Sequence, residues 1–221
     1  GYGVRGWFWD RFRDALAARG LEAQAPDLDF STITAAIDDA RRRVEAANAA
    51  AGPVTLIGHS MGAVLSAITA RDLGPDVVER AILVAPPWGE RGSTPPLVTW
   101  LIRRRLLPGF LIRGRFFGRH TERAEQARIF GKAVPESEAL MDAVFAPRWF
   151  HVPLLPGRIA GNLTVVASEG DRVVPAGQSR AMAERIGARF HLIPAAEGVG
   201  HNDFATSVTV AENLIADFVV S

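Results

Sequence analysis

The amino-acid sequence predicts an α/β fold in which a mostly parallel sheet is flanked by helices. Short apolar runs alternate with longer amphipathic runs along much of the 221 residues, which is the pattern of parallel strands joined by crossover helices. With 48% apolar and 22% charged residues, the chain can bury a real core and is not of the disordered class. Cysteine is absent, which excludes disulfide scaffolds, thiolate zinc sites and cysteine nucleophiles. We expect one domain over residues 1–221.

The expected elements follow from the spacing of apolar residues. Short runs rich in β-branched and apolar residues predict strands at 21–25, 54–57, 80–85, 163–167 and 190–193. Apolar residues three or four apart predict a helix over 33–50, which we expect Ser31 or Thr32 to cap. Further helices are expected at 7–19, 62–72, 177–186 and 205–220. Residues 46–70 lack charge and are long enough for a membrane span, but Gly52 and Pro53 interrupt them, so we expect a buried strand followed by a buried helix.

The alternation fails between residues 86 and 161, where prolines separate apolar and arginine-rich pieces. So long an insertion between two strands must lie outside the sheet, and we expect a helical cap over about 91–160. Residues 91–130 hold nine arginines and two glutamates, a local charge of +7. We expect a solvated basic face over an apolar pocket; the alternative is weak contact with an anionic membrane surface.

The strongest indication of chemical activity in the sequence is the GxSxG motif Gly58-His59-Ser60-Met61-Gly62, which is the pattern of a nucleophile elbow. An apolar strand is expected before it and a helix rich in small residues after it. A serine at such a sharp turn has strained backbone angles, and the glycines on either side remove the collisions that side chains would cause. The same string also satisfies GxxxG, and Ser60 could simply be a small residue in a tight turn.

A serine nucleophile needs a base and an acid that orients the base. Asp171 follows the expected strand 163–167, and His201 lies in a loop after the expected strand 190–193. Both would therefore lie at the carboxyl ends of parallel strands, where open α/β sheets bind their ligands. Glu169 and Glu90 remain alternatives for the acid. Four histidines compete with His201: one inside the motif, one within a strand and two in the cap, namely His59, His191, His120 and His151.

With these motifs in the order Ser, Asp, His, the sequence resembles the α/β-hydrolase superfamily. The resemblance rests on GHSMG, EGDRVVP and GVGHN, and on the cap inserted after the strand that follows the elbow. It implies an oxyanion hole formed by the backbone amides of Met61 and Tyr2. In this family, a strand that ends in His-Gly precedes the loop that carries the second oxyanion amide. Residues 1–9 resemble that loop, and the strand before it is not in the sequence. We therefore expect an N-terminally truncated copy of a longer protein.

The resemblance implies a serine hydrolase that cleaves a carboxylic ester of a largely apolar acyl substrate through an acyl-enzyme, with no cofactor. No cluster of residues has metal-ligand spacing, so we expect no metal site. A thioesterase, a carbon–carbon bond hydrolase, a cofactor-free haloperoxidase and a non-catalytic binding protein or fragment are the alternatives. The expected partner is a small-molecule substrate; the formal net charge of +1 gives no argument for nucleic acid. No signal peptide is visible, and together with the missing cysteine this favours the cytoplasm.

Overall fold

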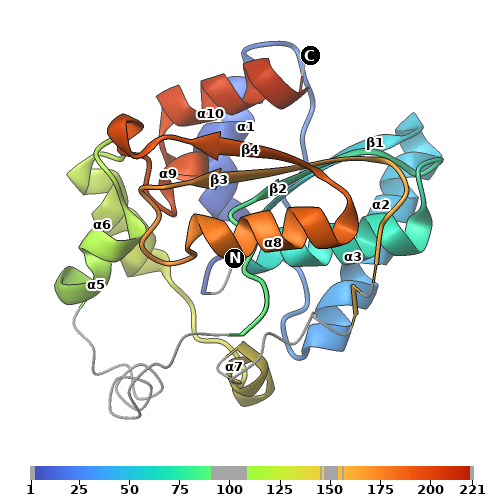
Figure 1. Ribbon diagram of the computed structural model, residues 1–221, viewed down its shortest axis with the longest axis horizontal. Helices are drawn as coiled ribbons and strands as arrows, with labels where there is room; N and C mark the ends of the chain where they lie inside the picture. The colour runs from blue at the N-terminus through green and yellow to red at the C-terminus, as the bar shows by residue number, and fades with distance from the viewer. Residues whose placement is uncertain (1–2, 91–108, 145, 147–153, 156, 220–221) are drawn as a thin grey trace.

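A four-stranded parallel sheet forms the centre of the computed structural model, which describes residues 3–90, 109–144, 146, 154–155 and 157–219 (Figure 1). The strands are β1 (Val54–His59), β2 (Val78–Val84), β3 (Asn162–Ser168) and β4 (Arg189–Ile193), paired in the order β1-β2-β3-β4. Four of the five expected strands are therefore confirmed.

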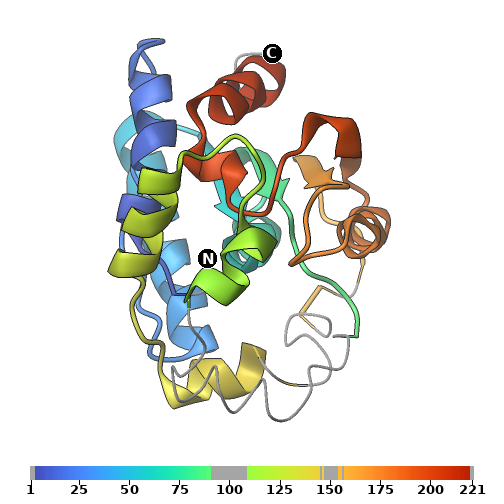
Figure 2. The ribbon, with the colours of Figure 1, turned by 90° about the vertical axis from the view of Figure 1, so that its left-hand side faces the viewer.

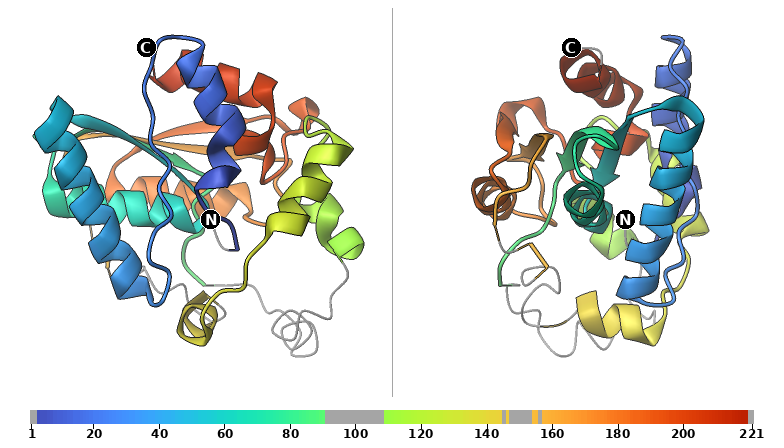
Figure 3. Two further views of the ribbon diagram at one scale, coloured as in Figure 1. Left: turned by 180° about the vertical axis from the view of Figure 1, so that it is seen from behind. Right: turned by 90° about the vertical axis from the view of Figure 1, so that its right-hand side faces the viewer.

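Both faces of the sheet are covered, so the central strands β2 and β3 are buried over most of their length, whereas the edge strand β4 alternates exposed with half-buried residues. In β2, Ala81 and Leu83 pack on one side with α3 (Met61–Leu73) and α8 (Ala176–Ile186). Ile82 and Val84 pack on the other side with α1 (Asp10–Ala17) and α10 (Val208–Leu214). Figure 3 shows α1 and α2 (Ile33–Ala51) from behind. The uncharged stretch 46–70 is the end of α2, β1 and most of α3, as expected.

The expected helix 33–50 is confirmed, and Thr32 caps it by accepting a hydrogen bond from the Ala35 amide at 3.0 Å. The expected helix 7–19 is split into a 3₁₀ turn, Gly6–Trp9, and α1. The carboxyl-terminal part also contains the 3₁₀ turn η2 (Ala195–Glu197), the short helix α9 (Asp203–Thr206) and the π-helical turn η3 (Ile215–Val219). Within the described residues, no helix is long and apolar enough to cross a membrane.

Two expected elements are wrong. Residues 21–25 form no strand; the Leu21 amide donates to the Leu16 carbonyl at 3.1 Å, and a strand needs a neighbouring ladder that the described residues do not supply here. The single helix expected over 205–220 is broken at Ser207, whose backbone is extended (φ −100°, ψ 126°). Ser207 instead caps α10 by accepting from the Val210 amide, the local hydrogen bonding by which serine competes with a helix interior.

The segment between β2 and β3 contributes α5 (Gly109–Phe116), α6 (Arg123–Lys132) and α7 (Glu138–Val144), and no strand of the sheet in its described part. Figure 1 places α5 and α6 beyond the carboxyl ends of the strands, and Figure 2 looks onto that end. The position of these helices agrees with a cap over about 91–160, a boundary that remains a prediction.

Several of the described cap arginines make contacts within the chain. Arg128 pairs with Glu125 at 2.6 Å, Arg119 donates to the Ala196 carbonyl at 3.0 Å, and Arg113 lies 5.9 Å from the centre of the Phe130 ring. Some of the cap arginines therefore stabilise the fold through contacts within the protein. The rest of the arginine-rich stretch, 91–108, lies outside the described residues, and membrane contact stays a prediction.

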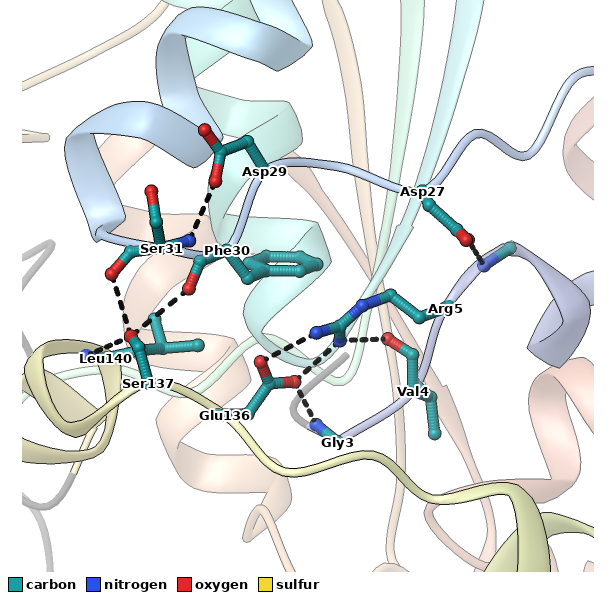
Figure 4. Close-up of polar contacts among 11 residues, drawn as sticks. Gly3, Val4, Arg5, Asp27, Asp29, Phe30, Ser31, Glu136, Ser137 and Leu140 are labelled. Carbon is teal, nitrogen blue, oxygen red and sulfur yellow. Dashed lines mark hydrogen bonds and ion pairs between the residues drawn. The ribbon is translucent and has the colours of Figure 1, made fainter.

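The cap segment is tied to the start of the described chain by Glu136, a residue of the loop that joins α6 to α7, whose side chain is buried (Figure 4). Its carboxylate accepts from the Gly3 amide at 2.7 Å and from both terminal nitrogens of Arg5 at 2.7 and 3.0 Å. Nearby, the Ser137 hydroxyl donates to the Ser31 carbonyl at 2.7 Å. A two-pronged arginine–carboxylate pair fixes direction as well as distance, so the cap and the amino-terminal segment are held as one unit.

Candidate active site

Ser60 lies at the sharp turn between β1 and α3, where its backbone has φ 55° and ψ −123°. A positive φ is strained for any residue with a Cβ, and it sets the serine apart from the strand and helix around it. The Ser60 amide donates to the Val84 carbonyl of β2 at 2.8 Å, and its own carbonyl accepts from Ala63 at 3.0 Å. The turn is thus held by the sheet on one side and by the start of the helix on the other.

Gly58 allows this turn to close. A Cβ at position 58 would lie 2.5 Å from the Ser66 hydroxyl oxygen and 2.6 Å from the Cα of Ala63, closer than atoms of these kinds approach in proteins. The backbone of the strand and the first turn of α3 can therefore meet only if residue 58 has no side chain. This is the physical reason for the first glycine of the motif.

Asp171 lies in the turn after β3, with its side chain 1% exposed. One carboxylate oxygen, Oδ1, accepts from the amides of Val173 and Val174 at 2.7 and 2.9 Å. The other oxygen, Oδ2, is 2.7 Å from Nδ1 of His201. Two backbone donors therefore fix the rotation of the carboxylate and leave one oxygen for the histidine.

His201 lies in the loop after β4 and η2, with its side chain 4% exposed. A carboxylate only accepts hydrogen bonds, so the contact with Asp171 places the proton of the neutral ring on Nδ1. The other ring nitrogen, Nε2, is then free to accept a proton. This is the tautomer that a general base for a serine requires.

The loop of His201 reaches the nucleophile turn through His59, the residue before Ser60. The ring centres of His59 and His201 are 4.5 Å apart, and Nε2 of His59 lies 2.7 Å from the carbonyl oxygen of His201. Since a carbonyl only accepts, His59 donates this bond. The structure thus brings Asp171, His201 and the Ser60 turn together at the carboxyl ends of β1, β3 and β4.

Burial keeps His59 uncharged. Its ring is enclosed near Phe8 and His201, and Nδ1 is one of the buried polar atoms that lack a hydrogen-bond partner in the described part of the chain. Burial, and then the nearby His201, hold the pKa of His59 well below its usual value of 6.5. Protonation would place an uncompensated charge in the core.

We expect acid to destabilise the protein through His59. Below about pH 6.5 the unfolded chain binds a proton at this residue and the folded chain does not, so the free energy of unfolding falls by up to about 1.4 kcal/mol per pH unit from this group. A His59→Gln variant keeps a donor toward the His201 carbonyl but does not titrate. Urea unfolding between pH 5 and 7 should give a shallower pH dependence in the variant; equal dependences would contradict the assignment.

The alternative candidates serve other contacts. Glu169 is exposed and accepts from the Ala195 amide at 2.9 Å, while Glu90 is exposed after β2. Nε2 of His120 contacts the Glu197 carbonyl at 2.6 Å, and His191 lies within β4, as expected. His151 lies outside the described residues.

For the expected oxyanion hole, the structure describes one of the two donors. Met61 is buried as the first residue of α3, and the first amides of a helix have no partner within the helix. Tyr2 lies outside the described residues, so its role stays a prediction.

Two side chains of the site were not recognised from the sequence. From the sequence, His59 is only a rival base inside the motif, whereas in the structure it holds the backbone carbonyl of His201. Asp203 was not singled out at all, although it is fully buried two residues after His201. A charged residue followed by Phe204 and Ala205 is a weak signal for a buried carboxylate.

Comparison with known proteins agrees with the fold. Residues 1–212 match the family model of the alpha/beta hydrolase family, and no curated protein matches the chain. Among solved structures, a bromoperoxidase from Bacillus anthracis is similar, with a TM-score of 0.77 and 16% identity over 100% of this chain and 90% of that chain.

Two esterases are also similar. The esterase from Exiguobacterium antarcticum has a TM-score of 0.77 and 19% identity, over 98% of this chain and 88% of that one. A thermophilic esterase from Thermogutta terrifontis has a TM-score of 0.69 and 19% identity, over 98% and 86%. At these identities the likeness to solved structures shows the fold alone.

Proposed function

Because this chain belongs to the alpha/beta hydrolase family, we propose that it is a serine hydrolase that cleaves a carboxylic ester of a largely apolar acyl substrate. The observation that carries the proposal is the buried pair of Asp171 and His201 beside the strained turn of Ser60. A carboxylate that fixes an imidazole next to a partly exposed, strained serine is the arrangement that acyl transfer needs.

In the proposed reaction, the Ser60 oxygen attacks the ester carbonyl carbon while Nε2 of His201 takes the hydroxyl proton. Asp171 holds the imidazole by its Nδ1 proton and stabilises the positive charge that forms. The amide of Met61, with that of Tyr2, donates to the oxygen that becomes negative, and one such donor contributes roughly a hundredfold or more in rate.

Collapse of the tetrahedral intermediate breaks the bond to the alcohol, which receives the proton from His201 and leaves. The acyl group is then an ester of Ser60. In the second half, His201 takes a proton from water, the hydroxide attacks the acyl carbon, and Ser60 leaves with the proton returned. The products are the alcohol and the carboxylic acid, and the reaction needs no cofactor.

Esters are favoured over the alternatives by the esterases among the similar structures, while the bromoperoxidase among them keeps halogenation as the second candidate. The full chain should be assayed with p-nitrophenyl esters of increasing acyl length, with matched acyl thioesters, and for bromination with bromide and peroxide. We expect a burst of nitrophenol equal to the enzyme present, followed by steady turnover. Bromination without ester cleavage would overturn the proposal, and a strong preference for thioesters would replace the substrate class.

A further inference from the structure

The carboxylate of Asp203 is the most enclosed charged group near the site, with its residue 0% exposed. It accepts three hydrogen bonds. Oδ2 accepts from the amides of Gly200 at 2.9 Å and Gly118 at 3.0 Å, and Oδ1 accepts from the hydroxyl of Thr121 at 2.6 Å. Every contact is a donation to the carboxylate, as a buried negative group requires.

The three donors come from two segments that lie far apart in the sequence. Gly200 precedes His201 in the loop after β4, whereas Gly118 and Thr121 lie in the turn between α5 and α6 of the cap. Asp203 therefore joins the histidine loop to the cap. Figure 1 shows these segments side by side beyond the carboxyl ends of the strands, next to α9.

Backbone contacts run alongside this carboxylate. The Asn202 amide donates to the Phe116 carbonyl at 2.7 Å, and the Arg119 amide donates to the Gly198 carbonyl at 3.2 Å. The imidazole of His120 adds a contact with the Glu197 carbonyl at 2.6 Å. The histidine loop thus lies against the cap turn along its length.

Two glycines make this approach close. A Cβ at Gly118 would lie 2.5 Å from Oδ2 of Asp203 and 2.6 Å from the amide nitrogen of Gly200. A Cβ at Gly200 would lie 2.6 Å from the carbonyl carbon of Phe117. These two glycines permit the close contact, but glycine also has the widest choice of backbone angles. If the hydrogen bonds to Asp203 were lost, the histidine loop would therefore be free to move.

We propose that Asp203 is a positioning residue for His201, which fixes the histidine loop against the cap turn so that Nε2 is held at the Ser60 turn. His59 holds the carbonyl of His201 from the sheet side, and Asp203 holds the residue before it from the cap side. The inference rests on the proposed function, since it assumes that the position of His201 limits turnover.

The expected result of Asp203→Ala is a fall in kcat of about a hundredfold with little change in KM, because a shift of about 1 Å in a catalytic group costs that much in rate. Asp203→Asn should recover most of kcat. Its carbonyl can accept from both backbone amides, and its amide group can donate to the Thr121 hydroxyl, so the geometry is kept without the charge.

The matched control is Asp39→Ala. Asp39 is also a buried carboxylate, held on α2 by Arg43 at 3.0 Å and Arg42 at 3.1 Å, and it makes no contact with the site. We expect this variant to lose stability with kcat unchanged.

A milder test of the contact between Asp203 and the cap compares two variants of Thr121. Thr121→Val removes one hydrogen bond to Asp203, whereas Thr121→Ser keeps it.

A second readout does not depend on turnover. The Nδ1 proton of His201, held by Asp171, gives a proton NMR resonance far downfield of the amides, which a His201→Gln variant identifies. We expect this resonance to broaden in Asp203→Ala and to persist in Asp203→Asn and Asp39→Ala. If the wild-type protein shows the resonance but no hydrolysis, the proposed function fails while the positioning role is still measured.

Three results would overturn the proposal. One is a folded Asp203→Ala variant with wild-type kcat and a sharp resonance. Another is an Asp203→Asn variant as impaired as the alanine variant, which would assign the effect to charge. If Asp203→Ala does not fold, equal kcat in Thr121→Val and Thr121→Ser would overturn it, and a lower kcat in the valine variant alone would support it.

Discussion

Replacing Ser60 with alanine is expected to lower kcat about a millionfold, the loss seen when a triad serine is removed from a comparable enzyme. Alanine cannot form the acyl-enzyme, and the remaining groups can only orient water. The fold should be kept, because serine and alanine face the same backbone restriction at φ 55°. Single-turnover and steady-state assays on an ester, with thermal melting of both proteins, measure this prediction.

Ser137→Ala is a suitable control for Ser60→Ala. Ser137 lies in the cap, donates its hydroxyl to the carbonyl of Ser31 just before α2, and is outside the proposed machinery, so its loss should leave kcat unchanged. An active Ser60→Ala variant with a melting temperature like that of the wild type would remove the serine from the mechanism.

Replacing Asp171 with asparagine is expected to lower kcat about ten-thousandfold, as in the comparable change in a serine protease. The Val173 and Val174 amides both donate to Oδ1, so an asparagine must keep its oxygen there. Its amide group then faces Nδ1 of His201 and donates to it. That forces the proton onto Nε2, where the base is lost.

Glu169→Gln is the control for Asp171→Asn, because Glu169 is the rival acid in the same turn. Glu169 accepts from the Ala195 amide, so we expect at most a small loss of stability and no change in kcat. The two acids exchange roles if the glutamine variant is inactive and the asparagine variant is active. The comparison is made on kcat with one ester at one pH.

The fold was predictable where burial and hydrogen bonding agree with local propensity. Strands such as β3, apolar and covered on both faces, are visible as short apolar runs. Residues 21–25 show where prediction from local sequence fails. Their composition suits a strand, but the segment alone does not reveal whether a neighbouring strand is present to pair with it. The break at Ser207 has the same cause, since the apolar spacing runs through it and only the cap contact with Val210 ends one helix and starts the next.

The site was predictable as far as each residue follows a strand. Asp171 and His201 are predictable because they come after β3 and β4, and the hydrogen bond between them agrees with that prediction. The role of Asp203 could not be predicted, because its partners Gly118 and Thr121 lie more than 80 positions away in the cap. No spacing rule within one segment shows a contact of that kind.

The measurement that tests the central claim most directly is labelling of the full chain with a fluorophosphonate, a probe that reacts with activated serines, followed by mass spectrometry. We expect one adduct, located on Ser60, and a much slower reaction in a His201→Gln variant. A folded wild-type protein that takes no label at Ser60, or a label at Ser60 that forms equally fast without His201, would contradict the claim.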